Sequence, residues 1–246
     1  MKTWPYPFWI AHRGAGKLAP ENTLAAFRLG AAHGWRMFEC DAKLSADGVP
    51  FLMHDSELER TTDGHGIAGE QTWSQLSQRD AGSWHSRTHA GEPLPTLENV
   101  ARFCLRNGYL LNIEIKPTPG AERTTGETVA ALAARLWSGA DVPPLLTSFK
   151  PFALEGARAS APQLPRGLLL ENLRGGWLAE ARDLECVAVV CKYSAWTRQT
   201  VAETHAAGLR ALCYTVNDAE SAEHVTDFGV DGIISDRIDF FTPAQA

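Results

Sequence analysis

The sequence lacks the features that would mark a secreted or membrane-spanning protein. Its five cysteines are an odd number without a CxxC pair, so neither a disulfide framework nor a thiolate zinc site is expected. No stretch approaches the ~18 consecutive apolar residues of a membrane span. The N-terminal segment before Ile10 has no apolar core of the signal-peptide type. Together these absences predict a cytoplasmic protein without a membrane span.

An excess of positive charge is also missing. The net charge is −6, so nucleic acid and anionic membranes gain no general electrostatic attraction and are not expected as partners. The glycine-rich loop of nucleotide-binding sheets is absent as well. A phosphate-bearing ligand would therefore need a local cluster of cations. The sequence leaves the oligomeric state open.

What the chain does contain is a regular alternation of short apolar runs and longer Ala-rich helical patterns. Its 246 residues are close to the roughly 250 of a (β/α)8 barrel, and 44% hydrophobic residues suffice for one large core. Eight strand–helix repeats favour a parallel TIM barrel, formed by residues 1–246 as a single domain, over an open α/β sheet. The predicted strands are Phe8–His12, Arg36–Asp41, Leu110–Lys116, Leu145–Phe149, Gly167–Leu170, Cys186–Cys191, Arg210–Tyr214 and Gly232–Ser235. The predicted helices are Thr23–His33, Leu97–Arg106, Gly126–Trp137, Phe152–Ala159, Arg198–Ala207 and Ala219–Asp227.

Two segments interrupt this repeat. Val49–Met53 is a strand pattern, but it follows Asp41 too closely for a parallel crossover, which needs about a dozen residues. Asp47-Gly48 predicts a type I′ turn, so we expect a β-hairpin arm after the second strand, with Asp41 facing His54. Residues 56–95 are polar and too long for a bare loop. They predict a small cap inserted at the C-terminal mouth of the barrel, where active sites lie.

Three carboxylates fall on neighbouring predicted strands. Glu39 and Asp41 are two residues apart and therefore point to the same face, and Glu114 and Lys116 are related in the same way. Three carboxylates at adjacent strand ends form an all-oxygen site for Mg²⁺, with Ca²⁺ as the alternative; zinc is disfavoured because sulfur and nitrogen ligands are not clustered here. The competing interpretation is that the acids are solvated or paired with Lys or Arg.

Two histidines lie at predicted strand ends beside these acids. His12 ends the first strand and His54 ends the hairpin arm, and histidine can donate or accept a proton near neutral pH. Either alone could instead be an ordinary hydrogen-bonded histidine. Arg13 has a planar fork suited to phosphate oxygens, or it pairs with Glu21. Asp55 either orients a histidine or holds the backbone of the arm.

These segments in combination resemble the glycerophosphodiester phosphodiesterases. The likeness is carried by the HRG…PENT…ECD…DG…HD series and by IEIK, and it continues through TSF, YTVND and GIISDRID to cover nearly the whole chain. In PENT, Asn22 or Thr23 is also expected to be a helix N-cap. The length and the absent leader are similar to the cytoplasmic bacterial type. The resemblance implies a distorted TIM barrel with a small inserted cap and a divalent metal.

The resemblance also implies roles for individual residues. The metal carboxylates of the family correspond to Glu39, Asp41 and Glu114, and its paired catalytic histidines to His12 and His54.

The remaining correspondences concern the substrate. The phosphate-binding cations of the family correspond to Arg13 and Lys116. The family often has tryptophan where this chain has Tyr214. This departure bears on the shape of the wall around the leaving alcohol and not on the expected chemistry. Phe149 is expected as a second wall residue.

The expected function is metal-dependent hydrolysis of small glycerophosphodiesters, such as glycerophosphocholine or glycerophosphoethanolamine, to glycerol 3-phosphate and an alcohol. Which histidine is the acid, and whether water or the 2-hydroxyl of the substrate attacks phosphorus, are left open. One alternative is a related phosphodiesterase acting on lysophospholipids or phosphoinositol esters. Another is a non-catalytic barrel that binds phosphodiesters. A metal amidohydrolase is disfavoured, because the first strand ends in IAHRG and lacks an HxH pair.

Overall fold

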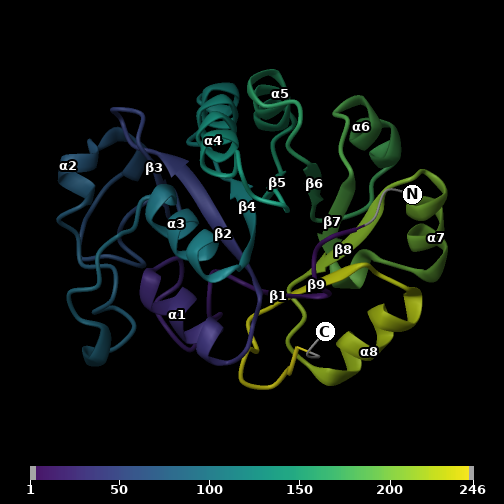
Figure 1. Cartoon of the computed structure of the whole chain (residues 1–246), viewed down its shortest axis with the longest axis horizontal. Coiled ribbons are helices and arrows are strands. Elements are labelled where there is room, and N and C mark those ends of the chain that lie inside the picture. The colour runs from purple at the N-terminus through teal and green to yellow at the C-terminus, as the bar shows by residue number, and fades with distance from the viewer. Residues whose placement is uncertain (1–3, 244–246) are drawn as a thin grey trace.

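The computed structural model describes residues 4–243, and its centre is a closed barrel of eight parallel strands (Figure 1). The barrel closes because β1 pairs in parallel with both β9 and β2. All eight predicted strands are present, and the predicted TIM barrel is confirmed. The barrel strands are β1 (Trp9–Ala11), β2 (Met37–Leu44), β4 (Leu110–Ile115), β5 (Leu145–Ser148), β6 (Arg166–Leu170), β7 (Ala188–Lys192), β8 (Arg210–Tyr214) and β9 (Gly232–Ser235).

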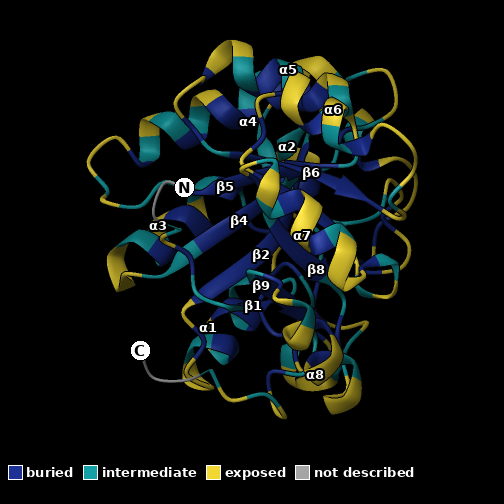
Figure 2. Cartoon of the chain, turned by 90° about the vertical axis from the view of Figure 1, so that its right-hand side faces the viewer, coloured by how far each residue is buried: buried dark blue, intermediate teal, exposed yellow. Residues whose placement is uncertain are grey.

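Helices surround the barrel, with buried inner faces and exposed outer faces (Figure 2). They are α1 (Leu24–Ala32), α3 (Leu97–Asn107), α4 (Glu122–Leu136), α5 (Pro151–Ser160), α6 (Trp177–Asp183), α7 (Arg198–Ala206) and α8 (Ala219–Phe228). Side-chain oxygens of Thr23, Thr96, Thr197 and Asp218 cap four of them. The six predicted helices are confirmed. The short α6 was not predicted, since seven residues give a weak periodic signal.

The alternation of side chains along the strands separates two apolar regions. Cys40, Ile113 and Ile115 point outward and pack in the cluster beneath α3 and α4. Ile10 and Met37 point into the barrel, where they join a smaller cluster. All five cysteines are free and buried. No helix of the described chain combines the length and apolar character needed to cross a bilayer.

The predicted hairpin arm is present, but its register differs by one residue from the prediction. Strand β3 (Pro50–Leu52) pairs antiparallel with β2, with Ala42 opposite Leu52. The N–H of Met53 donates to the carbonyl of Asp41 at 3.0 Å, so Asp41 faces Met53 and not His54. His54 therefore lies one residue beyond the end of the ladder.

The turn explains the shift. Three residues separate Ser45 from Val49, and only the last of them, Gly48, has a positive φ (+81°). This is the three-residue hairpin loop with a glycine bulge, whereas a type I′ turn would require positive φ at Asp47 as well. The hydroxyl of Ser45 donates to the carboxylate of Asp47 at 2.6 Å and accepts from the N–H of Val49 at 2.9 Å. These side-chain bonds stabilise the longer loop.

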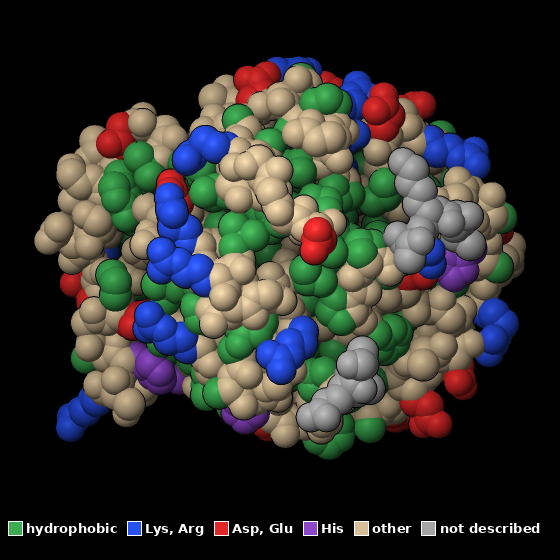
Figure 3. All heavy atoms as spheres, in the orientation of Figure 1, with side chains coloured by type: hydrophobic (Ala, Val, Ile, Leu, Met, Phe, Trp, Pro, Cys, Tyr) green, Lys and Arg blue, Asp and Glu red, His purple; other side chains and the backbone are tan. Residues whose placement is uncertain are grey.

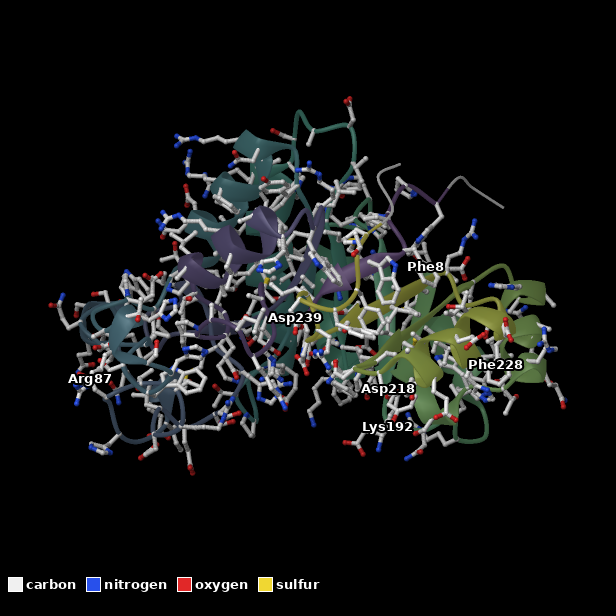
Figure 4. All side chains as sticks on the ribbon, turned by 90° about the horizontal axis from the view of Figure 1, so that it is seen from below. Phe8, Arg87, Lys192, Asp218, Phe228 and Asp239 are labelled. Atoms are coloured by element: carbon white, nitrogen blue, oxygen red, sulfur yellow. The ribbon has the colours of Figure 1, made fainter. Side chains whose placement is uncertain are left out.

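The insertion, residues 56–95, packs beside the hairpin (Figure 1). It contains the short helix α2 (Trp73–Leu76), two 3₁₀ turns, η1 (Ala68–Glu70) and η2 (Arg87–His89), and a small apolar cluster shared with β3. The imidazole of His85 contacts the carbonyl of Lys17 at 3.0 Å, and the carboxylate of Glu92 accepts from the N–H of Ala25 at 3.0 Å. In Figure 4, Arg87 of the insertion and Phe228 of α8 lie at opposite ends of the molecule. The insertion therefore extends sideways from the barrel near α1.

Candidate active site

A cavity of about 1250 Å³ opens at the C-terminal ends of the barrel strands. Of the insertion, only Ser56 is among its described lining residues. Asp41 lies directly beneath this surface, where its side chain is 1% exposed. The other eight predicted site residues line the cavity, namely His12, Arg13, Glu39, His54, Glu114, Lys116, Phe149 and Tyr214. The structure thus brings the whole predicted set to one place.

Glu39, Asp41 and Glu114 form a compact acidic cluster, in which one carboxylate oxygen from each lies within 4.8 Å of the others. The parallel pairing of β2 and β4 places Asp41 directly beside Glu114. Oε2 of Glu39 accepts from the N–H of Arg13 at 3.0 Å, but its buried Oε1 has no hydrogen-bond partner among the described residues. A buried carboxylate oxygen without a donor, beside two more carboxylates, fits a hard cation with oxygen ligands.

The three carboxyl groups differ in their affinity for protons. Burial, and then the charges of Asp41 and Glu114, raise the pKa of Glu39 well above its usual range. Burial, and then the charge of Asp41, raise the pKa of Glu114 to about 7. Burial also acts on Asp41, but the neighbouring cations Arg13 and Lys116 outweigh it and hold the pKa of that carboxyl below its usual range. Near neutral pH the metal-free cluster therefore retains protons that a divalent cation would displace.

This proton competition predicts a pH-dependent metal affinity. Because the pKa of Glu114 is raised to about 7, its carboxyl is protonated below that pH in the metal-free protein, and bound Mg²⁺ must displace the proton. We expect the dissociation constant for Mg²⁺, measured by calorimetry, to fall as the pH rises from 5.5 through 7, the range in which Glu114 loses its proton. Binding at pH 6 in buffers of different ionisation enthalpy should reveal proton release. A dissociation constant that does not change over this range would contradict the assignment.

Two cations connect the acidic cluster to the cavity. The guanidinium of Arg13 lies 2.8 Å from Glu21 and 3.3 Å from Asp41, and the ammonium of Lys116 lies 3.0 Å from Glu114 and 3.5 Å from Asp41. The pair of Arg13 with Glu21 is thus present together with its contact to the cluster. Both side chains still border the cavity, where they can meet a phosphate group.

His12 directly follows β1 and is held by a carboxylate that the sequence analysis did not select. Its Nδ1 lies 2.6 Å from Oδ1 of Asp236, and its Nε2 lies 3.9 Å from Glu39. Asp236 is itself fixed by Asn217, whose amide donates to Oδ2 at 2.8 Å and whose side-chain oxygen accepts from the N–H of Asp236. Asp236 follows β9, so the rule that strand ends carry the chemistry could have identified it.

His54 is held in a similar way from the arm. Its Nδ1 lies 2.6 Å from Asp55, so Asp55 orients the histidine. Arg60 of the insertion lies 2.5 Å from Asp55 and 2.7 Å from Glu21, and Glu21 in turn pairs with Arg13. Burial lowers the pKa of His54, which favours the neutral imidazole near pH 7. A continuous chain of one hydrogen bond and three ion pairs thus fixes His54 and Arg13 relative to each other.

Two more polar residues complete the base of the site. Thr23 is the N-cap of α1, whereas Asn22, at φ +61°, donates to the carboxylate of Asp41 at 2.8 Å and accepts from its N–H. Asn22 is therefore a site residue, and its tolerance of positive φ is the signal that could have separated it from Thr23. Lys43 is buried, and its ammonium donates to the carbonyl of Lys116 at 3.1 Å. Burial lowers the pKa of Lys43 to about 8.

Two aromatic side chains form one wall of the cavity. The rings of Phe149 and Tyr214 meet edge to face at 5.9 Å, and the ammonium of Lys116 lies 5.8 Å from the centre of the Phe149 ring. The hydroxyl of Tyr214 donates to the carbonyl of Leu170 at 2.9 Å. Tyr214 therefore contributes the side of its ring to the wall.

The C-terminal mouth of this TIM barrel combines three clustered carboxylates, two histidines backed by carboxylates, and two cations. This combination is typical of enzymes that act on phosphate esters. Residues 12–240 match the model of the glycerophosphoryl diester phosphodiesterase family, and the chain belongs to that family. A glycerophosphodiester phosphodiesterase of Caldanaerobacter subterraneus subsp. tengcongensis is 32% identical over 92% of this chain and 93% of its own.

Solved structures agree in fold. A phosphodiesterase of Oleispira antarctica, solved in complex with the product sn-glycerol 3-phosphate, is 35% identical, with a TM-score of 0.87 over 94% of this chain and 93% of its own. A glycerophosphodiester phosphodiesterase of Agrobacterium tumefaciens is 28% identical, with a TM-score of 0.80 over 96% and 99% of the two chains.

Proposed function

We propose that this protein hydrolyses glycerophosphodiesters, such as glycerophosphocholine and glycerophosphoethanolamine, to glycerol 3-phosphate and an alcohol, with a divalent metal and histidine acid–base catalysis. The observation that supports this most strongly is the convergence of three buried carboxylates and two carboxylate-backed histidines on one cavity. A barrel that only bound phosphodiesters would not need both histidines held in this way. The glycerol 3-phosphate bound to the Oleispira antarctica relative supports the same product class.

Glu39, Asp41 and Glu114 are the residues that would hold the metal, and their oxygen donors favour Mg²⁺ over zinc, with Ca²⁺ as the alternative. A bound divalent cation supplies Lewis-acid polarisation of a phosphoryl oxygen and lowers the pKa of a coordinated hydroxyl or water. Asn22 steadies Asp41 through two hydrogen bonds, so one of the three ligands is already fixed in place.

The side chains around the metal site perform the remaining steps. The attacking oxygen comes either from water or from the 2-hydroxyl of the substrate. It forms the new bond to phosphorus while the bond from phosphorus to the leaving alcohol breaks. One of His12 and His54 takes the proton of the attacking oxygen, and the other gives a proton to the leaving oxygen. If the 2-hydroxyl attacks, a water molecule then opens the cyclic phosphate to give glycerol 3-phosphate. Arg13 and Lys116 stabilise the negative charge on the phosphoryl group.

The test of this proposal is the release of glycerol 3-phosphate from glycerophosphocholine with Mg²⁺, with Ca²⁺ and with EDTA. We expect release with a divalent metal and none with EDTA. Folded protein that releases no glycerol 3-phosphate under any of these conditions would overturn the proposal. Saturable binding of the diester without turnover would point to a binding role.

Asp236 is expected to act through His12 as a positioning residue. The change Asp236→Asn keeps the shape but removes the carboxylate at 2.6 Å from Nδ1 of His12. Loss of the carboxylate that orients a proton-transferring histidine costs up to about 10⁴-fold in a catalytic triad, and we expect a loss up to that size in kcat with little change in KM or Tm. Asp239→Asn is the control, because Asp239 is exposed and pairs with Arg237. A fall in Tm that accounts for the whole loss of activity would assign Asp236 a purely structural role.

A further inference from the structure

The half of the cavity around the ends of β5, β6 and β7 carries three cations that the mechanism above does not use. Lys150 follows β5, Arg174 follows β6, and Lys192 ends β7. In the strand order of the closed barrel, β6 lies across from β1 and β7 lies across from β2, whereas β5 is the neighbour of β4. All three side chains line the same cavity as the catalytic set. They are called the distal cation group below.

Acids balance only part of the charge of this half. Arg174 lies 2.5 Å from Glu180. Backbone hydrogen bonds, and then the charge of Lys150, lower the pKa of Glu122, but neither Lys150 nor Lys192 lies within 4.0 Å of a described carboxylate. The one acid that lines this half, among the described residues, is Glu171. All three cations are exposed, and Lys192 lies at the outer edge of the ribbon in Figure 4. Because they also line the cavity, their charges border both the solvent and the space that a bound substrate would enter.

The cavity also extends beyond what a small diester requires. Its volume of about 1250 Å³ exceeds the roughly 300–1,000 Å³ of clefts that hold drug-sized ligands. A phosphate between Arg13 and Lys116 occupies only the β1–β4 side. One of the two alcohol groups of the diester can therefore extend past Phe149 toward β6 and β7.

The aromatic wall does not favour a cationic alcohol at this point. A quaternary ammonium is commonly bound over the faces of aromatic rings. The ring of Phe149 already has the ammonium of Lys116 at 5.8 Å from its centre, so a second cation there would meet a like charge. Glu171 is the one described carboxylate lining this half that would attract it.

We propose that the distal cation group is a subsite for an anionic alcohol, so that the preferred substrates are glycerophosphodiesters whose second alcohol carries a further phosphate group. This specificity rests on the hydrolysis proposed above. It predicts discrimination by the charge of the alcohol, with cationic alcohols disfavoured, neutral alcohols intermediate and anionic alcohols favoured.

Three substrates with a common glycerophosphoryl group test the subsite. They are glycerophosphocholine, glycerophosphoglycerol and 1,3-bis(glycerophospho)glycerol, with a cationic, a neutral and an anionic alcohol. Glycerol 3-phosphate release is measured with saturating Mg²⁺ at low ionic strength, since salt screens exposed charges. We expect kcat/KM to rise in that order, after correction for the two equivalent bonds of the last substrate, and the difference to shrink as salt is added.

Substitutions in the distal cation group test whether these residues produce the preference for an anionic alcohol. The changes Lys150→Ala and Lys192→Ala should each lower the ratio of kcat/KM for the bis ester to that for the choline ester by about 2–5-fold, the range of exposed charge pairs. The charge reversal Lys192→Glu should lower that ratio further. Arg106→Ala is the matched control, because Arg106 is an exposed cation of α3 outside the cavity. Figure 3 shows Lys and Arg side chains gathered on the outer surface over α3, which is labelled at the same place in Figure 1.

The outcomes separate the two proposals. Equal kcat/KM for the three substrates, with ratios unchanged in the lysine variants, would overturn the subsite and leave the hydrolysis standing. A ratio that falls as much in Arg106→Ala as in the lysine variants would show that net charge alone matters, and this too would overturn the subsite. No glycerol 3-phosphate from any of the three would overturn the proposed function itself.

Discussion

Replacing His54 by alanine is expected to reduce kcat by about 10²–10⁴-fold, the usual contribution of a positioned proton-transfer group. His54 lines the cavity at the end of the hairpin arm, and the Asp55–Arg60–Glu21 chain fixes its ring. The histidine is not part of the acidic cluster, so Mg²⁺ affinity should be nearly the same as in the wild type. Steady-state rates and calorimetric Mg²⁺ titrations of the same preparation provide the two measurements.

The control for this change is His65→Ala. His65 lies in the insertion with 87% of its side chain exposed, so its loss removes a histidine without touching the cavity. We expect the rate and the metal affinity of this variant to match those of the wild type. Turnover that survives undiminished in His54→Ala would remove His54 from the proposed pair of proton-transfer groups.

The second large effect is expected for Glu114→Gln, which keeps the shape of the side chain but removes a charge from the acidic cluster. Changes to groups that merely support metal ligands already cost about 10–100-fold in affinity or activity. Loss of a direct ligand should weaken Mg²⁺ binding by at least that factor. The same change removes the partner of Lys116 at 3.0 Å, so KM for the diester should change as well.

Glu223→Gln serves as the matched control, because Glu223 is exposed on α8, away from the cavity. The two Glu→Gln variants differ only in position, so any difference in Mg²⁺ titration reports on the cluster itself. Equal Mg²⁺ affinity in the wild type and in Glu114→Gln would remove Glu114 from the metal site. Weakened binding in both variants would indicate a general effect of net charge.

The sequence was sufficient to predict the barrel, because the patterns that indicate its strands and helices are local and recur along the chain. Each barrel strand is a short apolar run, and each long helix has its own periodic pattern. The inward direction of Glu39, Asp41 and Glu114 followed from the two-residue period of a strand. Glu39 and Glu114 line the cavity, and Asp41 lies beside them in the acidic cluster, in agreement with that prediction.

What the sequence could not provide depends on side chains that are distant in the chain. The hairpin register was wrong by one residue because the hydroxyl of Ser45 stabilises a three-residue loop where the Asp47-Gly48 pair alone indicated two. Asp236 was missed because its partner His12 is 224 residues away and the two meet only when β9 pairs with β1.

Arg60 illustrates the same limitation in the insertion. It lies in a segment without strand or helix signals, and its importance comes entirely from contacts with Asp55 and Glu21. A polar segment of this length could be recognised as an insertion from its composition alone. Which of its residues reaches back to the site depends on how the insertion packs against the barrel.

The most direct test of the account measures Mg²⁺ occupancy and glycerol 3-phosphate release on the same samples of wild type, His54→Ala and Glu114→Gln. The account predicts that the wild-type rate follows metal occupancy, that His54→Ala binds Mg²⁺ normally without comparable turnover, and that Glu114→Gln needs more Mg²⁺ for both. Turnover in the wild type that persists at full rate when no metal is bound would contradict it.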